Sequence, residues 1–101
     1  MVSPAYFAQF FGERIVNITQ TAGDNRAFIH TFGAHNLVDG TEVLIKYVVG
    51  ISNINDLVFP ITSVGPSMFT IPLKLNGAYV RDGTYQIASL AYNYLPQLRG
   101  H

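Results

Sequence analysis

The chain has 101 residues, which is enough for one domain and too few for two. Hydrophobic residues make up 49% of it and charged residues only 12%, about half the charged fraction of an average globular domain. The apolar content argues against disorder. Low charge combined with seven Phe and six Tyr residues predicts that other chains cover part of the surface.

Charge and cysteine content argue against several classes of protein. Six basic and six acidic residues give a formal net charge of zero, and the basic residues are scattered singly. Nucleic acids and anionic membranes both attract clustered cations, so neither is an expected partner. Without cysteine the chain has no disulfide, thiolate nucleophile or iron–sulfur ligand, which favours intracellular assembly for a domain this small. We expect neither a signal peptide nor a membrane span.

Residues 1–13 are predicted to form an N-terminal helix or arm. Ser3-Pro4 is typical of a helix start and Gly12 of a helix end. The segment between them is rich in aromatic residues, namely Tyr6, Phe7, Phe10 and Phe11. A helix this short is unstable alone in water, so we expect it to dock on another surface.

Residues 14–92 are predicted to form the domain, and residues 93–101 a C-terminal tail. The expected strands are residues 14–20, 27–32, 42–49, 58–64, 68–73 and 84–92. Turn residues separate them at intervals of roughly ten, which predicts an all-β fold: a small antiparallel barrel or sandwich of about six strands. Pro60 and Pro72 each remove a ladder donor, so we expect them at edges or bulges.

Apolar side chains that alternate along successive strands are expected to face one core. The predicted core residues are Phe28 or Phe32, Val43, Ile45, Phe59, Ile61, Phe69 and Ile71. Gly40 and Gly50 are expected to supply unusual backbone angles.

A pattern of turns and apolar positions runs through the middle of the chain: His35-Asn36-Leu37, Asp39-Gly40, Val43-x-Ile45, Val49-Gly50, Asn55, Phe59-x-Ile61-x-x-Val64 and Phe69-Thr70-Ile71. Over about residues 14–85 it resembles the small β-barrel modules of tailed-phage structural proteins. Such modules are similar to the first catalytic cysteine half-domain of ubiquitin-activating enzymes, a likeness that implies no ubiquitin chemistry in phages. The resemblance implies a small barrel with a structural role in the virion. Residues 33–40 are expected to form a corner before the third strand. Asn36 replaces the usual glycine of the pattern there, and asparagine tolerates the left-handed conformation that the corner needs.

The candidate chemistry is sparse. His30 is expected to be a partly buried, hydrogen-bonded residue, and His35 to bond a local backbone group. Neither has a neighbour in sequence that would tune it as a base, and the pair lacks a third metal ligand. The loop that holds Asn53, Asn55 and Asp56 does not fit a calcium-binding loop. Because catalytic and phosphate-binding motifs are also absent, we expect no enzyme activity, cofactor or metal.

The leading hypothesis is a non-enzymatic structural protein of a phage virion, assembled in the host cytoplasm. It would be a homo-oligomer or dock on neighbouring virion proteins, as a tail, neck or baseplate component or as a capsid decoration (cement) protein. The two ends are expected to carry the contacts, through Tyr6, Phe7, Phe10, Phe11, Tyr92, Tyr94, Leu95 and Leu98. One end could instead plug the barrel mouth.

The alternative is a carbohydrate-binding module for adsorption to a host. It rests on four tyrosines late in the chain, Tyr79, Tyr85, Tyr92 and Tyr94, which could form a stacking platform. Tyrosine is also enriched at protein interfaces, and we favour that interpretation.

Overall fold

The computed structural model describes residues 12–89. It is all-β, as predicted, with seven strands: β1 (Glu13–Thr19), β2 (Ala27–Thr31), β3 (Glu42–Lys46), β4 (Leu57–Pro60), β5 (Thr62–Gly65), β6 (Met68–Ile71) and β7 (Thr84–Ile87). The last strand was expected to extend to residue 92, but β7 ends at Ile87 because Ala88 and Ser89 adopt helical geometry. Glu13, the last residue of the expected N-terminal arm, already belongs to β1. The rest of that arm and the tail at residues 93–101 lie outside the described residues.

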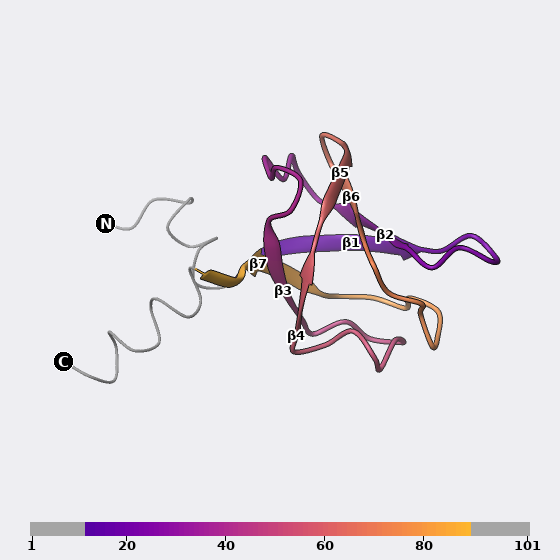
Figure 1. Cartoon of the computed structure of the whole chain (residues 1–101). Helices are drawn as coiled ribbons and strands as arrows, with labels where there is room; N and C mark the ends of the chain where they lie inside the picture. The colour runs from indigo at the N-terminus through magenta and orange to yellow at the C-terminus, as the bar shows by residue number, and fades with distance from the viewer. Residues whose placement is uncertain (1–11, 90–101) are drawn as a thin grey trace.

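All neighbouring strands are antiparallel, in the order β4-β3-β7-β1-β2-β6-β5, and the sheet curls into a nearly closed barrel (Figure 1). β1 lies in the middle of the sheet. Its first residues pair with β7, as in Glu13 with Tyr85, and the rest of it pairs with β2, as in Ile18 with Ile29. β7 therefore joins the β3–β4 half of the sheet to the half built from β1, β2, β6 and β5.

The two edge strands of the sheet are consecutive in the chain and are separated by Ile61 alone. The Ile61 N–H donates to the carbonyl oxygen of Thr41 (2.9 Å), and its own carbonyl oxygen accepts from the N–H of Gly40 (2.8 Å). These bonds turn the chain away from β3, so the single strand expected over residues 58–64 is two strands, β4 and β5. The turn at Ile61 also closes the barrel, because it links the two edge strands β4 and β5.

The core contains the predicted residues of three strands, β3, β4 and β6, and of the β4–β5 junction: Val43, Ile45, Phe59, Ile61, Phe69 and Ile71 are buried. The prediction for β2 is wrong, because Phe28 is only half-buried and Phe32 is 72% exposed. The opposite side of β2 faces inward, where Ile29 pairs with Phe69. Phe69 and Tyr85 already occupy the barrel interior, with ring centroids 5.3 Å apart, so two further phenyl rings would overfill it.

Backbone angles and the missing N–H groups of proline account for the remaining strand ends and turns. The third strand ends at Lys46, short of the expected residue 49, because Tyr47 adopts a φ of 65°. Asn36 has a φ of 54° at the corner, which confirms the left-handed conformation expected there. Pro60 lies on the edge strand β4, and Pro72 follows the end of β6, as their missing N–H groups require.

Candidate interaction surface

The outer face of β2 carries a row of three flat side chains. Phe28 and His30 point outward from the strand, and Phe32 follows at the same spacing one residue past its end. We call these three residues the β2 stripe. Side chains two residues apart on a strand are separated by about 7 Å. The stripe is therefore a row of outward-facing rings, with Phe32 the most exposed of the three.

An arginine lies over each phenylalanine of the stripe. The Arg26 guanidinium carbon is 5.5 Å from the centroid of the Phe28 ring, and that of Arg14 is 5.6 Å from the centroid of the Phe32 ring. Both distances are within the range of cation–π attraction. Among residues 12–89, Arg14 makes no ion pair. Its charge lies against the ring, available to a partner.

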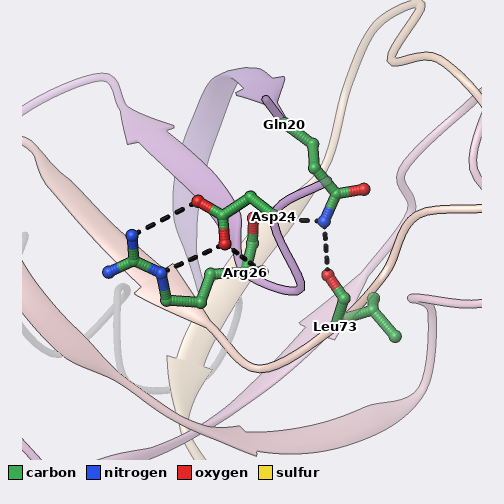
Figure 2. A network of polar contacts seen from close by, with 4 residues as sticks. All are labelled: Gln20, Asp24, Arg26 and Leu73. Atoms are coloured by element: carbon green, nitrogen blue, oxygen red, sulfur yellow. Dashed lines mark hydrogen bonds and ion pairs between the residues drawn. The ribbon is translucent and has the colours of Figure 1, made fainter. Parts of the chain in front are cut away.

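Arg26, by contrast, is held from both sides, as Figure 2 shows. Its guanidinium contacts both carboxylate oxygens of Asp24 at 3.2 Å, and its backbone N–H donates to Asp24 Oδ1 at 2.9 Å. The side-chain bond and then the backbone bond lower the pKa of the Asp24 carboxyl. The Arg26 carbonyl oxygen also accepts from the side-chain amide of Gln20 (3.1 Å), and the same amide donates to Leu73 (2.8 Å). The turn before β2 is thereby tied to Gln20 just after β1 and, through Gln20, to Leu73 after β6.

The middle of the stripe is fixed as well. The His30 Nε2 atom lies 3.0 Å from the Thr19 hydroxyl, which agrees with the expectation of a partly buried, hydrogen-bonded ring. Its cross-strand neighbours are Asn17 and Met68. The ring therefore acts as part of a preformed surface, held by contacts with β1.

An apolar groove of about 340 Å³ runs beside the stripe. Its lining comprises Arg26, Gly40, Pro60, Ile61, Thr62, Thr70, Ile71 and Pro72. Thr70 pairs with Phe28 across the strands, so the groove and the stripe share a border at Arg26 and Phe28. A partner that covers the stripe can extend into this groove.

Further large apolar side chains are exposed elsewhere on the barrel. They are Val16, Val38, Tyr47, Leu57, Val64 and Val80. Tyr47 also has a cation near its ring, since Lys46 Nζ is 6.0 Å from the ring centroid. The stripe differs from these because its rings are consecutive outward positions of one strand.

His35 is a buried structural residue. Its Nε2 lies 2.8 Å from the Gly65 carbonyl oxygen and 3.2 Å from that of Met68, so this nitrogen carries the proton and donates. Its Nδ1 accepts from the N–H of Leu37 (2.9 Å), the local backbone bond that was predicted. The ring also packs edge-on against Phe69. Both nitrogens are engaged with the backbone and hold the corner to the β5–β6 hairpin.

The loop amides likewise serve the fold. Asn55 accepts from the N–H of Val48 and donates to its carbonyl oxygen, and Asn53 donates to the carbonyl oxygen of Lys74. These bonds shape a hollow of about 420 Å³ beside Val48 and Asn76. Within residues 12–89, no three histidine, aspartate or glutamate residues lie together as a metal site would require.

Two of the four tyrosines proposed as a stacking platform face inward. Tyr85 is buried in the core, and Tyr79 is partly buried with its hydroxyl donating to the Ile15 carbonyl oxygen (3.4 Å). The described tyrosines therefore do not form an exposed platform. Tyr92 and Tyr94 lie outside the described residues, as do the other residues expected to carry contacts: Tyr6, Phe7, Phe10, Phe11, Leu95 and Leu98.

No protein-family model and no curated protein matches the chain. In the described part of the chain, no helix is long and apolar enough to cross a membrane.

Proposed function

We propose that the protein is a non-enzymatic structural subunit of a phage virion, which self-associates or docks on neighbouring virion proteins. The observation that carries this proposal is the β2 stripe: three outward rings, two of them under arginines, on a strand held by hydrogen bonds. Aromatic residues and arginine are the types enriched where proteins bind one another. Small monomeric domains seldom expose a contiguous row of this kind without a partner.

The distribution of charge supports the same function. Three of the described basic residues already contact an acidic residue of the same chain, namely Arg26 with Asp24, Lys46 with Asp56 and Arg81 with Asp82. At the stripe the charge of Arg26 is balanced by Asp24, so a covering subunit would need to supply a counter-charge only for Arg14. Burying a charge without a partner is costly, whereas burying apolar surface contributes about 25 cal/mol per Å².

The resemblance to tailed-phage barrel modules supports the virion assignment. The residues that carry it have scaffold roles here: Val43 and Ile45 are core residues, and His35 and Asp39 hold the corner. A scaffold of this kind leaves its outer surface free for assembly contacts. We place the protein in the tail, neck or baseplate, or on the capsid as a decoration protein, assembled in the host cytoplasm.

Sedimentation velocity of the full chain over a range of concentrations tests the assembly part of this proposal. We expect concentration-dependent association that Phe32→Ser weakens by roughly tenfold, the effect typical of removing one interface anchor. Val80→Ser is the matched control, because Val80 is also exposed but lies in the loop before β7. Its association should equal that of the unmodified chain.

Antibody labelling of purified particles tests the virion part. We expect label at one symmetric position, whose copy number then separates a tail component from a capsid decoration. A chain that stays monomeric at high concentration and is absent from the particle would contradict the proposal. Glycan-array binding by such a monomer would establish the carbohydrate-binding alternative instead.

A further inference from the structure

We infer that the β2 stripe is a two-fold contact, in which the stripe of one copy packs face to face and antiparallel on the stripe of a second copy. This inference rests on the proposed self-association and adds to it the surface that meets and the direction in which it meets. The two-fold axis lies in the plane of the contact and crosses the strands at His30. Phe28 of each copy therefore faces Phe32 of the other.

The order of side chains along the stripe is nearly the same from either end. A phenylalanine lies on each side of His30. An arginine lies over each of these rings, Arg26 at one end and Arg14 at the other. A surface that meets its own copy about a two-fold axis must be complementary to itself in this way. Rotation about an axis at His30 places one phenyl ring against another at both ends, and such rings pack offset or edge to face.

The two ends differ in charge, and this difference sets the direction of the contact. Asp24 balances Arg26 at the Phe28 end, whereas Arg14 at the other end makes no ion pair among residues 12–89. A cover for the stripe must bring a carboxylate to Arg14, because burying a charge without a partner is costly. In the antiparallel arrangement, the Arg14 end of each copy meets the Asp24 end of the other. A parallel arrangement would bring the two Arg14 side chains together with no carboxylate for either.

Asp24 can accept a bond from a second arginine. A carboxylate has about four positions at which it accepts hydrogen bonds. Arg26 occupies three of them: its backbone N–H and its Nε donate to Oδ1, at 2.9 and 3.2 Å, and its Nη2 donates to Oδ2 at 3.2 Å. One position on Oδ2 remains for Arg14 of the second copy, and the Asp24 side chain is 22% exposed.

The N-terminal segment of the chain is a poorer cover for the stripe. Residues 1–11 include aromatic rings but no acidic side chain, so they would leave Arg14 buried without a counter-charge. The stripe of a second copy brings both rings and a carboxylate. The observations therefore favour stripe against stripe.

The stripe is short, so the contact is a weak one. From Phe28 to Phe32 it covers about 13 Å of strand, and the flanking strands β1 and β6 each add about 5 Å of width. A face of this size is at or below the low end of specific protein interfaces. We therefore expect a dissociation constant in the micromolar range, and association experiments need protein concentrations above that value.

Cysteine cross-linking tests the direction of the contact, since the full chain contains no cysteine of its own. Phe28→Cys and Phe32→Cys chains, one of them isotope-labelled, are mixed and treated with a short bifunctional methanethiosulfonate reagent. We expect the product that joins residue 28 to residue 32 to exceed the 28-to-28 and 32-to-32 products at least tenfold, because like positions lie about 13 Å apart along the strands. His30→Cys, at the axis, should cross-link to its own copy. Ala22→Cys, exposed in the β1–β2 turn, gives the background level.

Arg14→Gln tests the charge. The glutamine brings no positive charge to Asp24 of the second copy, so we expect association measured by sedimentation velocity to weaken roughly tenfold. Arg81→Gln is the matched control, because Arg81 is 68% exposed and lies before β7; its association should equal that of the unmodified chain. A cover without a carboxylate gives the opposite sign, since removing the unpaired charge would then strengthen association. Such a gain at Arg14→Gln would overturn the inference.

The remaining outcomes separate this inference from the proposed function. An excess of 28-to-28 and 32-to-32 products would show a parallel contact and overturn the antiparallel one. Association without cross-linking above the Ala22→Cys level would place the contact elsewhere on the barrel, which overturns the inference and leaves self-association intact. A chain that stays monomeric at high concentration would remove both the two-fold contact and self-association.

Discussion

The carboxylate oxygen Oδ1 of Asp39 accepts a hydrogen bond of 2.7 Å from the backbone N–H of Ser63, across the seam between the corner and β5. Residue 39 belongs to the turn before β3, and residue 63 lies in an edge strand. The bond therefore ties the edge of the sheet to the segment that closes the barrel. Asp39 lies in a turn, but its side chain makes a hydrogen bond to a residue 24 positions later in the chain.

Asp39→Ala removes the acceptor and leaves the Ser63 N–H to water. Because the bond is exposed, we expect a loss of about 1 kcal/mol in the free energy of unfolding. Asp39→Asn keeps an oxygen acceptor and should lose less than half of that. Urea denaturation of the three proteins measures the difference, and equal midpoints for all three would show that the bond contributes nothing.

Gly77 is a second position where the fold depends on one residue. A Cβ at Gly77 would lie 2.3 Å from the Gly50 carbonyl oxygen, which is backbone and has little freedom to move. We expect Gly77→Ala to cost about 3 kcal/mol by forcing apart the two loops. Gly33→Ala is the control, because no atom lies within 4 Å of its new methyl group. If thermal unfolding gave the two variants similar midpoints, the close packing of the two loops would be in doubt.

Phe59 and Phe32 form a matched pair of buried and exposed rings. Phe59 lies in the core, and Phe59→Ala should cost on the order of 3–5 kcal/mol through lost burial and the cavity left behind. Phe32→Ala should change the stability of the monomer by less than about 0.5 kcal/mol. Denaturation at concentrations below association measures both values. A stability loss at Phe32 equal to that at Phe59 would place Phe32 in the core after all.

Tyr85 makes stability depend on alkaline pH. Burial, and next the negative charge of Glu13, raise the pKa of the Tyr85 phenol to about 12, against about 10 in an unfolded chain. The unfolded state loses the proton first, so the contribution is complete below pH 10 and disappears as the pH rises toward 12. Tyr85→Phe should flatten this decline in unfolding free energy. An unchanged slope between pH 10 and 12 would assign the decline to other groups.

The alternation along β2 shows where sequence reasoning succeeds and where it stops. Two side-chain sets alternate there, one with Phe28 and Phe32 and the other with Ala27 and Ile29, and hydrophobicity alone favours the larger rings. The barrel selects the smaller set because Phe69 already fills the space opposite Ile29. The exposed rings of the candidate surface could be recognised only after this choice was known. In the sequence only Arg26 lies close to the stripe, two residues before Phe28, whereas Arg14 reaches Phe32 only through the pairing of β1 with β2.

The chemistry of single residues predicted their backbone angles and positions more reliably than the sequence predicted where strands begin and end. The left-handed angles at Asn36 and Gly50 and the edge position of Pro60 follow from the residues themselves. The break between β4 and β5 depends instead on bonds from Ile61 to Gly40 and Thr41, twenty residues earlier in the chain. Such contacts between distant residues have no signature in a window of neighbouring residues.

The position of β7 between β3 and β1 has a consequence for how the barrel forms. During synthesis, β1 and β3 are made long before the strand that both of them require as a partner. Until β7 emerges, one side of each has unpaired N–H and C=O groups, and such free edges promote aggregation of incomplete chains. Closure of the barrel therefore awaits residues 84–87, and contacts so distant in sequence form slowly.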